Sequence, residues 1–433
     1  MQRLLATALL LAACDPLTTT ERAALGTLSP AELPLPPIDV TNRFGDDLRA
    51  AALGKKFFFD TTFSGPLLDS DHDGGPQSLG RPGDTGKVAC ASCHLPESGF
   101  SDTRSFMLQI SLGAGWGRRR APSLLDVGQA RLLMWDGRRD ASYNQVFGPL
   151  ESVVEMNSSR LFLAQRIFAS YRTEYEAVFG AMPALDNVAQ FPSLSASLTG
   201  CQPLDPTGPS PTCDGTFHGM PGDHAEFDQL SPANQTAVTT VAVNFGKAIG
   251  AYERTLSCGR SAFDRWLHGE GAVSDSAVRG AKLFVGKAGC ASCHSGPFLS
   301  DQRFHNVGLQ PVPVQQGFVD DGDRGAATGL AAALADPLNS DGAFSDGRDD
   351  RLTSLPTLGN LEGAFRTPTL RCVSRRPTFM HTGQMGSLAQ VVGFFNRGGN
   401  TLGYPGHDEL MPLGLSDGEI ADVVDFLQSL DGS

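Results

Sequence analysis

Two short segments of the chain carry the same five residues, Cys-Ala-Ser-Cys-His, at positions 90–94 and 290–294. Two thiols on one helical turn can each form a thioether bond with a vinyl group of a haem, and the adjacent histidine can then ligate the iron. A redox-active dithiol does not need the histidine, and a zinc site would need a second pair of ligands nearby. The motif therefore predicts two covalently bound haem c groups. The predicted attachment residues are Cys90, Cys93, Cys290 and Cys293, and the predicted axial ligands of the iron are His94 and His294.

The elements that must position these motifs are also repeated. An amphipathic segment precedes each motif, Leu-Gly-Lys-Lys-Phe-Phe at 53–58 and Arg-Gly-Ala-Lys-Leu-Phe at 279–284. Near the C-terminus, Ser416 and Glu419 form a capping box before apolar residues at helical spacing, which predicts a helix over 416–430. Strand signals are few, and 50 glycines and 28 prolines indicate irregular connections. We predict a mainly α fold of two cytochrome c-like domains, each holding one covalent haem, with long irregular loops.

The repeat also predicts the domain organisation. The segment 180–232 has the Pro, Gly and Ser content of an inserted loop. The expected divisions are a lipoprotein signal peptide over 1–13, a tether over 14–45, an N-terminal haem domain over 46–235 that includes this loop, and a C-terminal haem domain over 236–433. A net charge of −13 argues against nucleic acid as a partner, because phosphate binding needs clustered Lys and Arg.

The N-terminus has the features of an export signal. Arg3 precedes the apolar run 4–13, which is too short to span a bilayer and suits the core of a signal peptide. Cys14 follows Leu-Ala-Ala, as at a bacterial lipoprotein cleavage site; a plain secretory signal is the alternative. No second apolar stretch of about 18 residues is present in the sequence. We therefore expect a periplasmic protein that meets the membrane only through a lipid on Cys14.

Four cysteines remain, an even number in an oxidising compartment. Cys201 and Cys213 bracket a Pro- and Gly-rich segment, which suggests a local disulfide. Cys258 and Cys372 would then form a long-range bridge.

Further residues around the two motifs carry a resemblance to a known family. Residues 134–138 read Met-Trp-Asp-Gly-Arg, and Gln145, Pro149 and Glu155 follow. The second half contains Phe-Arg-Thr-Pro-Thr-Leu-Arg at 365–371 and a Met-His-Thr-Gly stretch. With the haem motifs, these segments resemble the bacterial di-haem cytochrome c peroxidases and MauG.

The resemblance implies roles for four residues of the first half. Trp135 would lie between the two haems as a bridge, and Glu155 would be the acid and base for O–O cleavage. Gln145 would orient bound peroxide, and Pro149 would shape the same pocket. Heterolysis of peroxide needs a group that takes one proton and returns it to the leaving oxygen.

Three positions depart from the family pattern. Ala114 stands where classical members have a distal histidine, so the N-terminal haem should be permanently open, as in MauG. Phe395 stands where the family has a Met or Tyr ligand on the C-terminal haem; Met380, Met385 or a nearby histidine are the open alternatives. Arg120 and Arg376 correspond to two residues of an inter-haem calcium site, and two guanidinium groups would repel a cation, so calcium is not favoured.

The overall likeness is greatest to the di-haem enzymes associated with methanobactin-type operons, which oxidise a Trp of a partner protein. The resemblance thus implies an oxidoreductase that uses H2O2 at the open N-terminal haem, forms a high-valent state shared with the second haem, and oxidises a secreted protein partner. The first alternative is a cytochrome c peroxidase that reduces H2O2 to water with electrons from a small redox protein, a cytochrome or cupredoxin. A pure electron-transfer cytochrome is the alternative of another class.

Overall fold

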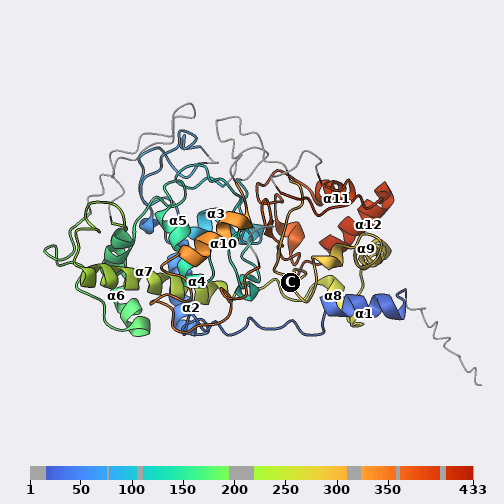
Figure 1. The fold of residues 1–433 in the computed structure, drawn as a ribbon, viewed down its shortest axis with the longest axis horizontal. Helices are drawn as coiled ribbons and strands as arrows, with labels where there is room; N and C mark the ends of the chain where they lie inside the picture. The colour runs from blue at the N-terminus through green and yellow to red at the C-terminus, as the bar shows by residue number, and fades with distance from the viewer. Residues whose placement is uncertain are drawn as a thin grey trace, which may run out of the picture.

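The structure is a computed structural model, and it describes residues 16–75, 78–104, 111–194, 219–309, 323–356, 361–399 and 406–432. It is mainly helical, as predicted (Figure 1). The α-helices are α1 (Thr19–Leu28), α2 (Leu48–Phe59), α3 (Cys90–Cys93), α4 (Ser142–Gln145), α5 (Phe147–Glu151), α6 (Arg160–Phe179), α7 (Pro232–Glu253), α8 (Ala262–Leu267), α9 (Asp275–Val285), α10 (Ala326–Ala335), α11 (Leu388–Asn396) and α12 (Asp417–Gln428). Two short strands, β1 (Phe304–His305) and β2 (Phe365–Arg366), pair in antiparallel register. None of the described helices is long and apolar enough to cross a membrane.

In the N-terminal half, the first and last helices cross at a glycine. The side chain of Asp47 caps α2, and Ser231 followed by a proline starts α7. A Cβ on Gly54 of α2 would collide with the carbonyl group of Ala248 on α7, so only glycine permits this close crossing. The buried apolar faces of α2, α6 and α7 then form one core cluster.

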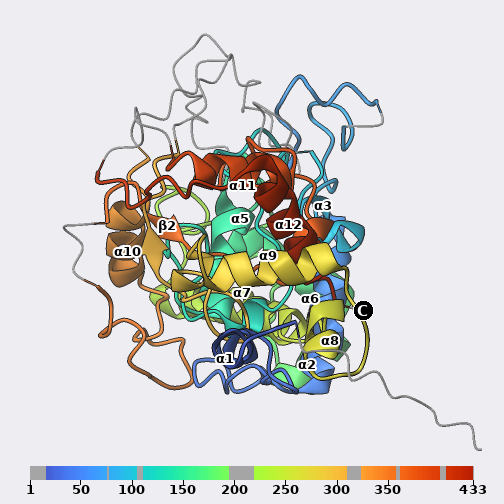
Figure 2. The same ribbon diagram turned by 90° about the vertical axis from the view of Figure 1, so that its right-hand side faces the viewer.

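The C-terminal half repeats this arrangement. A Cβ on Gly280 of α9 would collide with the carbonyl group of Asp422 on α12. Helix α12 begins after Ser416, and the predicted capping box with Glu419 is present, which confirms the predicted helix. Figure 2 shows α9 with α11 and α12 on one side and α1 and α8 on the other. The two halves therefore share one helical plan.

The repeat also includes two hairpins, one in each half of the chain. Residues 133–139 and 379–385 each close with a backbone hydrogen bond, 2.7 Å from Leu133 N to Arg139 O in the first and 2.8 Å in the second. The second residue of each hairpin is a methionine with positive φ, 67° at Met134 and 69° at Met380. Trp135 and His381 consequently occupy equivalent positions in the two halves.

Packing modifies the expected domain limits. Helix α7 lies wholly in the N-terminal core, so the expected boundary at 235/236 falls inside this helix, and a boundary after Glu253 suits the packing better. Within the expected tether, α1 buries Leu25 and Leu28 in the C-terminal core (Figure 1). The described parts of 180–232 form no regular element before α7 begins.

The two halves also exchange contacts. Helix α10 of the C-terminal half lies against the Trp135 hairpin, since a Cβ on Gly329 would collide with the carbonyl group of Asp136. Leu338 joins the N-terminal core, and Lys247 of α7 pairs with Asp346 at 2.8 Å. The halves are therefore interlocked rather than joined by a simple linker.

A disulfide joins Cys258 and Cys372, as predicted. It ties the connection after α7 to the segment that precedes the second hairpin. Cys14, the signal peptide and the Cys201–Cys213 pair lie outside the described residues.

Candidate functional site

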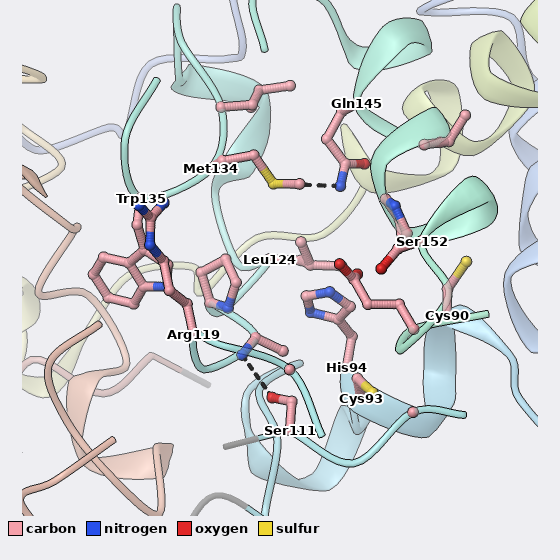
Figure 3. A pocket seen from close by; sticks show the side chains of 18 of the residues that line it. Cys90, Cys93, His94, Ser111, Arg119, Leu124, Met134, Trp135, Gln145 and Ser152 are labelled. Carbon is pink, nitrogen blue, oxygen red and sulfur yellow. Dashed lines mark hydrogen bonds between the residues drawn. The ribbon is translucent and has the colours of Figure 1, made fainter. Parts of the chain in front are cut away.

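A cavity of about 550 Å³, here called the large cavity, lies in the N-terminal half. Its volume is in the range of small-molecule and cofactor sites. Cys90, Cys93 and His94 line it from α3 and the residue that follows (Figure 3). The Nδ1 atom of His94 lies 3.1 Å from the carbonyl oxygen of Phe100, which leaves Nε2 as the ring nitrogen for another ligand.

The chemistry of this donor set fits a haem. Both cysteines are free, and burial raises the pKa of each thiol to about 12. Thiols held as S–H by an apolar site are poor zinc ligands, because zinc takes thiolates. Burial also lowers the pKa of His94, which keeps the imidazole neutral and able to ligate a metal.

The predicted peroxide-pocket residues line the same cavity. Gln145, Pro149 and Glu155 all belong to its wall, and Figure 3 shows Gln145 and Met134 on the side opposite His94. The amide nitrogen of Gln145 lies 3.7 Å from the sulfur of Met134. Burial raises the pKa of Glu155, although the charge of Arg138 acts in the other direction. A carboxyl group, an amide and an imidazole thus face one space.

The segment around Ala114, where the family resemblance implies a gating histidine, packs against the backbone of residues 154–155. Ala114 is fully buried, and its backbone N–H donates to the carbonyl oxygen of Glu155 at 2.6 Å. A Cβ on the preceding Gly113 would collide with that same stretch of backbone. Among the described residues that line the large cavity, His94 is the one histidine. Besides His94, the lining of the large cavity therefore offers amide and carboxyl groups but no described imidazole.

Trp135 lies between the large cavity and a smaller cavity of about 30 Å³, the interdomain cavity, and lines both. Its side chain is 8% exposed, and its Nε1–H donates to the carbonyl oxygen of Arg120 at 2.8 Å. The ring of His381 lies 6.4 Å away and stacks on Phe365 at 3.6 Å between centroids. The equivalent tips of the two hairpins thus meet at the interface of the halves.

The second motif repeats the geometry of the first. The Nδ1 atom of His294 lies 2.8 Å from the carbonyl oxygen of Leu299, and burial lowers the pKa of His294 to about 4. Leu299 has positive φ, as Phe100 has in the first half. Burial raises the pKa of Cys290 to about 11. The same fit to a haem therefore holds in the C-terminal half.

The open alternatives for the second axial position lie in different surroundings. Met385 packs against the C-terminal core, whereas the carbonyl group of Met380 faces the guanidinium of Arg120 at 3.4 Å. The ring of Phe395 contacts Phe394. The choice between the methionines stays a prediction.

Three buried arginines provide a further test of whether the two cavities suit a haem. Arg120 and Arg366 line both cavities, and Arg376 lines the interdomain cavity. Burial lowers the pKa of all three, and among the described residues none has a carboxylate within ion-pair distance. Buried guanidinium groups need an anion. A haem brings two propionate carboxylates, so these arginines fit that group. The charge of Arg376 acts on Arg120, so two cations are neighbours where the family pattern has calcium.

Glu253 also lines this cavity, and the sequence did not indicate it as a site residue. Glu253, the last residue of α7, lines the wall and is 7% exposed. In the sequence it follows Tyr252 and precedes Arg254, which is typical of a solvated helix end. Only the packing of α7 reveals its position.

Comparisons with known proteins agree with this geometry. The family model described as di-haem cytochrome c peroxidase matches residues 49–196. Cytochrome-c peroxidase IdrP1 of Denitromonas iodatirespirans is 27% identical over 419 residues, which cover 92% of this chain and 85% of the relative. The methylamine utilization protein MauG of Methylorubrum extorquens is 28% identical over 387 residues, which cover 88% and 77%.

Two solved structures share the fold. The di-haem peroxidase BthA of Burkholderia thailandensis matches with a TM-score of 0.60 and 20% identity, over 93% of this chain and 95% of that one. A MauG-like protein associated with microbial copper homeostasis matches with a TM-score of 0.56 and 22% identity, over 93% and 94%.

Fold and motifs together define a c-type cytochrome with two haem sites. The chain resembles the di-haem cytochrome c peroxidase family, through residues 49–196 and through relatives that align with most of its length. The relatives and the two motifs make it an oxidoreductase with two c-type haems, and that family uses H2O2 together with a protein substrate or redox partner.

Proposed function

We propose that the large cavity is the site where this protein reacts with H2O2 and that the oxidising equivalents then pass to a protein partner. Cys90, Cys93 and His94 would hold the haem of this site, and the second motif would hold the other haem. The observation that carries the proposal is the lining of the large cavity, to which Gln145 and Glu155 belong and where His94 is the one described histidine.

The residues of this wall have separate tasks. When bound, haem iron supplies the redox chemistry of peroxide reduction. Glu155 takes a proton from one peroxide oxygen and returns it to the leaving oxygen, a task that its raised pKa assists because burial makes the carboxylate a stronger base. The amide of Gln145 donates a hydrogen bond that orients the peroxide. Pro149 lacks an N–H group and limits the space beside it.

Electrons would reach the cavity through Trp135. The indole lines both cavities, packs with Phe365 in one buried cluster, and has its ring centroid 6.4 Å from that of His381 in the second hairpin. Oxidation of a protein partner, including a Trp side chain of that partner, is the reaction class that MauG-like members suggest. We place the protein in the periplasm, and the disulfide and thioether chemistry suit that compartment; anchoring by a lipid on Cys14 is part of the same proposal.

Simple peroxide reduction is the second candidate, because IdrP1 is named a cytochrome-c peroxidase. Steady-state turnover of H2O2 with a reduced small cytochrome or cupredoxin would favour it. A protein that carries electrons but leaves H2O2 unreacted would instead be a pure electron-transfer cytochrome.

The test of the proposal is Glu155→Gln. The amide cannot shuttle the proton, so the oxidised variant should react with H2O2 at least about 100-fold more slowly than the wild type, while it still binds two haems. Rapid mixing followed by haem absorbance measures this rate. Glu97→Gln, at an exposed position near the same motif, is the matched control and should react normally. An unchanged rate in Glu155→Gln would contradict the assigned role.

A further inference from the structure

Glu253 borders two separate hollows. It lines the large cavity, and it also lines a second hollow of about 190 Å³, here called the cleft. Val127 and Leu133 are the other residues that line both. The cleft opens to solvent near Ile38, whose side chain is 80% exposed. The carboxyl group of Glu253 is thus part of a thin wall between solvent and the large cavity.

The fold holds Glu253 firmly in this wall. The neighbouring Arg254 reaches outward, where its guanidinium pairs with Asp46 at 2.7 Å and donates to the carbonyl oxygen of Pro37 at 2.8 Å. On the other side, the ring of Tyr252 packs against Phe58 at 5.3 Å between centroids. These contacts anchor the end of α7 from both directions, so the intervening side chain points into the wall.

No described residue satisfies the carboxyl group. It has no side-chain hydrogen bond or ion pair among the residues that the structure describes, and Glu253 is 7% exposed. Burial raises the pKa of Glu253 to about 8. An unpaired buried carboxylate is costly, so the group is retained as the neutral acid near pH 7.

Charged groups line both hollows beside Glu253. Those lining the cleft are Asp39, Arg131, Asp140, Arg254, Asp349, Asp350 and Arg351. On the side of the large cavity, the charge of Glu253 acts on the thiol of Cys90, after burial the second cause of its raised pKa. The large cavity is also lined by charged and titratable groups besides Glu253, which are His94, Arg118, Arg119, Arg120, Asp136, Arg138, Glu155, Asp323 and Arg366. Glu253 therefore lies between two polar hollows, of which the cleft is the one on the side of solvent.

We propose that Glu253 passes protons from the cleft into the large cavity. The inference rests on the proposed function of that cavity and extends it. Reduction of peroxide follows H2O2 + 2 H⁺ + 2 e⁻ → 2 H2O, so the two electrons come from the partner and two protons must enter from solvent. Glu155 moves a proton between the two peroxide oxygens, which adds none. Glu253 supplies the missing route, because it can take a proton from the cleft and release it on the other side of the wall.

The first experiment needs no turnover. Infrared spectra of the holoprotein labelled with ¹³C-glutamate, recorded between pH 6 and 10, should show a protonated carboxyl band that disappears with a midpoint near pH 8. The band should be missing in Glu253→Gln and present in Glu155→Gln. Absence of such a band in the wild type, or its survival in Glu253→Gln, would overturn the proposal.

The second experiment measures steady-state turnover of H2O2 with a reduced small cytochrome over the same pH range, because protons are taken up together with the partner's electrons. In the wild type the rate should fall as pH rises through about 8, because the acid form is lost. Glu253→Gln should lose this limb and react about 100-fold more slowly at pH 7, with two haems bound. Glu97→Gln removes an exposed carboxylate that lines neither the cleft nor the large cavity and should keep the wild-type profile.

The outcomes separate the two proposals. A wild-type protein that does not react with H2O2 contradicts the proposed function itself. A wild type that reacts, with a Glu253→Gln variant of the same rate and pH profile, contradicts only the proton route. If Glu253→Gln reacts more slowly at every pH but its rate still falls above about pH 8, Glu253 has a structural role and the inference is also overturned.

Discussion

Replacement of Trp135 by phenylalanine separates a bridge between two haem sites from a packing residue. Phenylalanine retains an aromatic ring beside Phe365 and His381 but lacks the indole N–H. The hydrogen bond to the carbonyl oxygen of Arg120 is therefore lost. Indole is also more easily oxidised than phenyl, so the variant removes the redox property and keeps most of the shape.

The cost in stability can be worked from these contacts. A buried carbonyl group left without its donor costs about 1–3 kcal/mol. The smaller ring buries roughly 50 Å² less apolar surface, which at about 25 cal/mol per Å² adds about 1 kcal/mol. The total of about 2–4 kcal/mol is smaller than the usual free energy of unfolding of about 5–15 kcal/mol. Trp135→Phe should therefore fold and bind both haems.

The assay mixes oxidised protein with one equivalent of H2O2 and follows both haems by absorbance and electron paramagnetic resonance. In the wild type both haem signals should change together. In Trp135→Phe the N-terminal signal should still change, while the C-terminal signal and oxidation of the partner slow at least about tenfold, since Trp is the oxidisable link. Trp266 packs on Phe263 in the C-terminal core, so Trp266→Phe controls for the loss of an indole elsewhere in the protein. A C-terminal signal that changes at the wild-type rate in Trp135→Phe would refute the bridge.

Two further predictions concern haem attachment and stability. Cys90→Ala combined with Cys93→Ala should remove one of two haem equivalents on a haem-stained denaturing gel, and two remaining covalent haems would contradict the assignment. Arg371 and Asp264 are fully buried and paired at 2.7 Å, so Arg371→Met should lower the free energy of unfolding by about 3–5 kcal/mol at pH 7, measured in urea, against under about 1 kcal/mol for the exposed Arg279→Met. Burial acts to raise the pKa of Asp264, but the hydrogen bond and charge of Arg371 hold this pKa below its usual value. The pair therefore stabilises the fold above about pH 4, and this stabilisation is lost as pH falls through the lowered pKa. The difference in unfolding free energy between wild type and Arg371→Met should accordingly narrow in acid.

Local chemistry could be predicted well from the sequence. The spacing of Cys90, Cys93 and His94 is a property of one helical turn, and the structure places all three on the wall of one cavity. The capping box of Ser416 and Glu419 is likewise local, because a helix start depends on a few adjacent residues. The pairing of Cys258 with Cys372 followed from counting the cysteines that remained.

Other features depend on contacts between distant segments. Helix α1 lies in a segment expected as a tether, because its few apolar residues gain their significance only from the C-terminal core on which they pack. Helix α7 extends across the expected domain boundary, since its crossing with α2 at Gly54 assigns it to the N-terminal core. Hydrophobic periodicity predicts that a helix is buried but not which partner buries it.

The sequence by itself thus determined the two haem motifs and the duplicated helical plan, because each is encoded within a short span of chain, whereas Gln145 and Glu155 were indicated by the family resemblance. Only the tertiary structure decided which walls those residues share, that Trp135 separates two cavities, and that Glu253 lies between solvent and the large cavity. The physical reason is burial: the protonation of a carboxyl group depends on the water and charges around it, and these are set by segments far apart in the sequence.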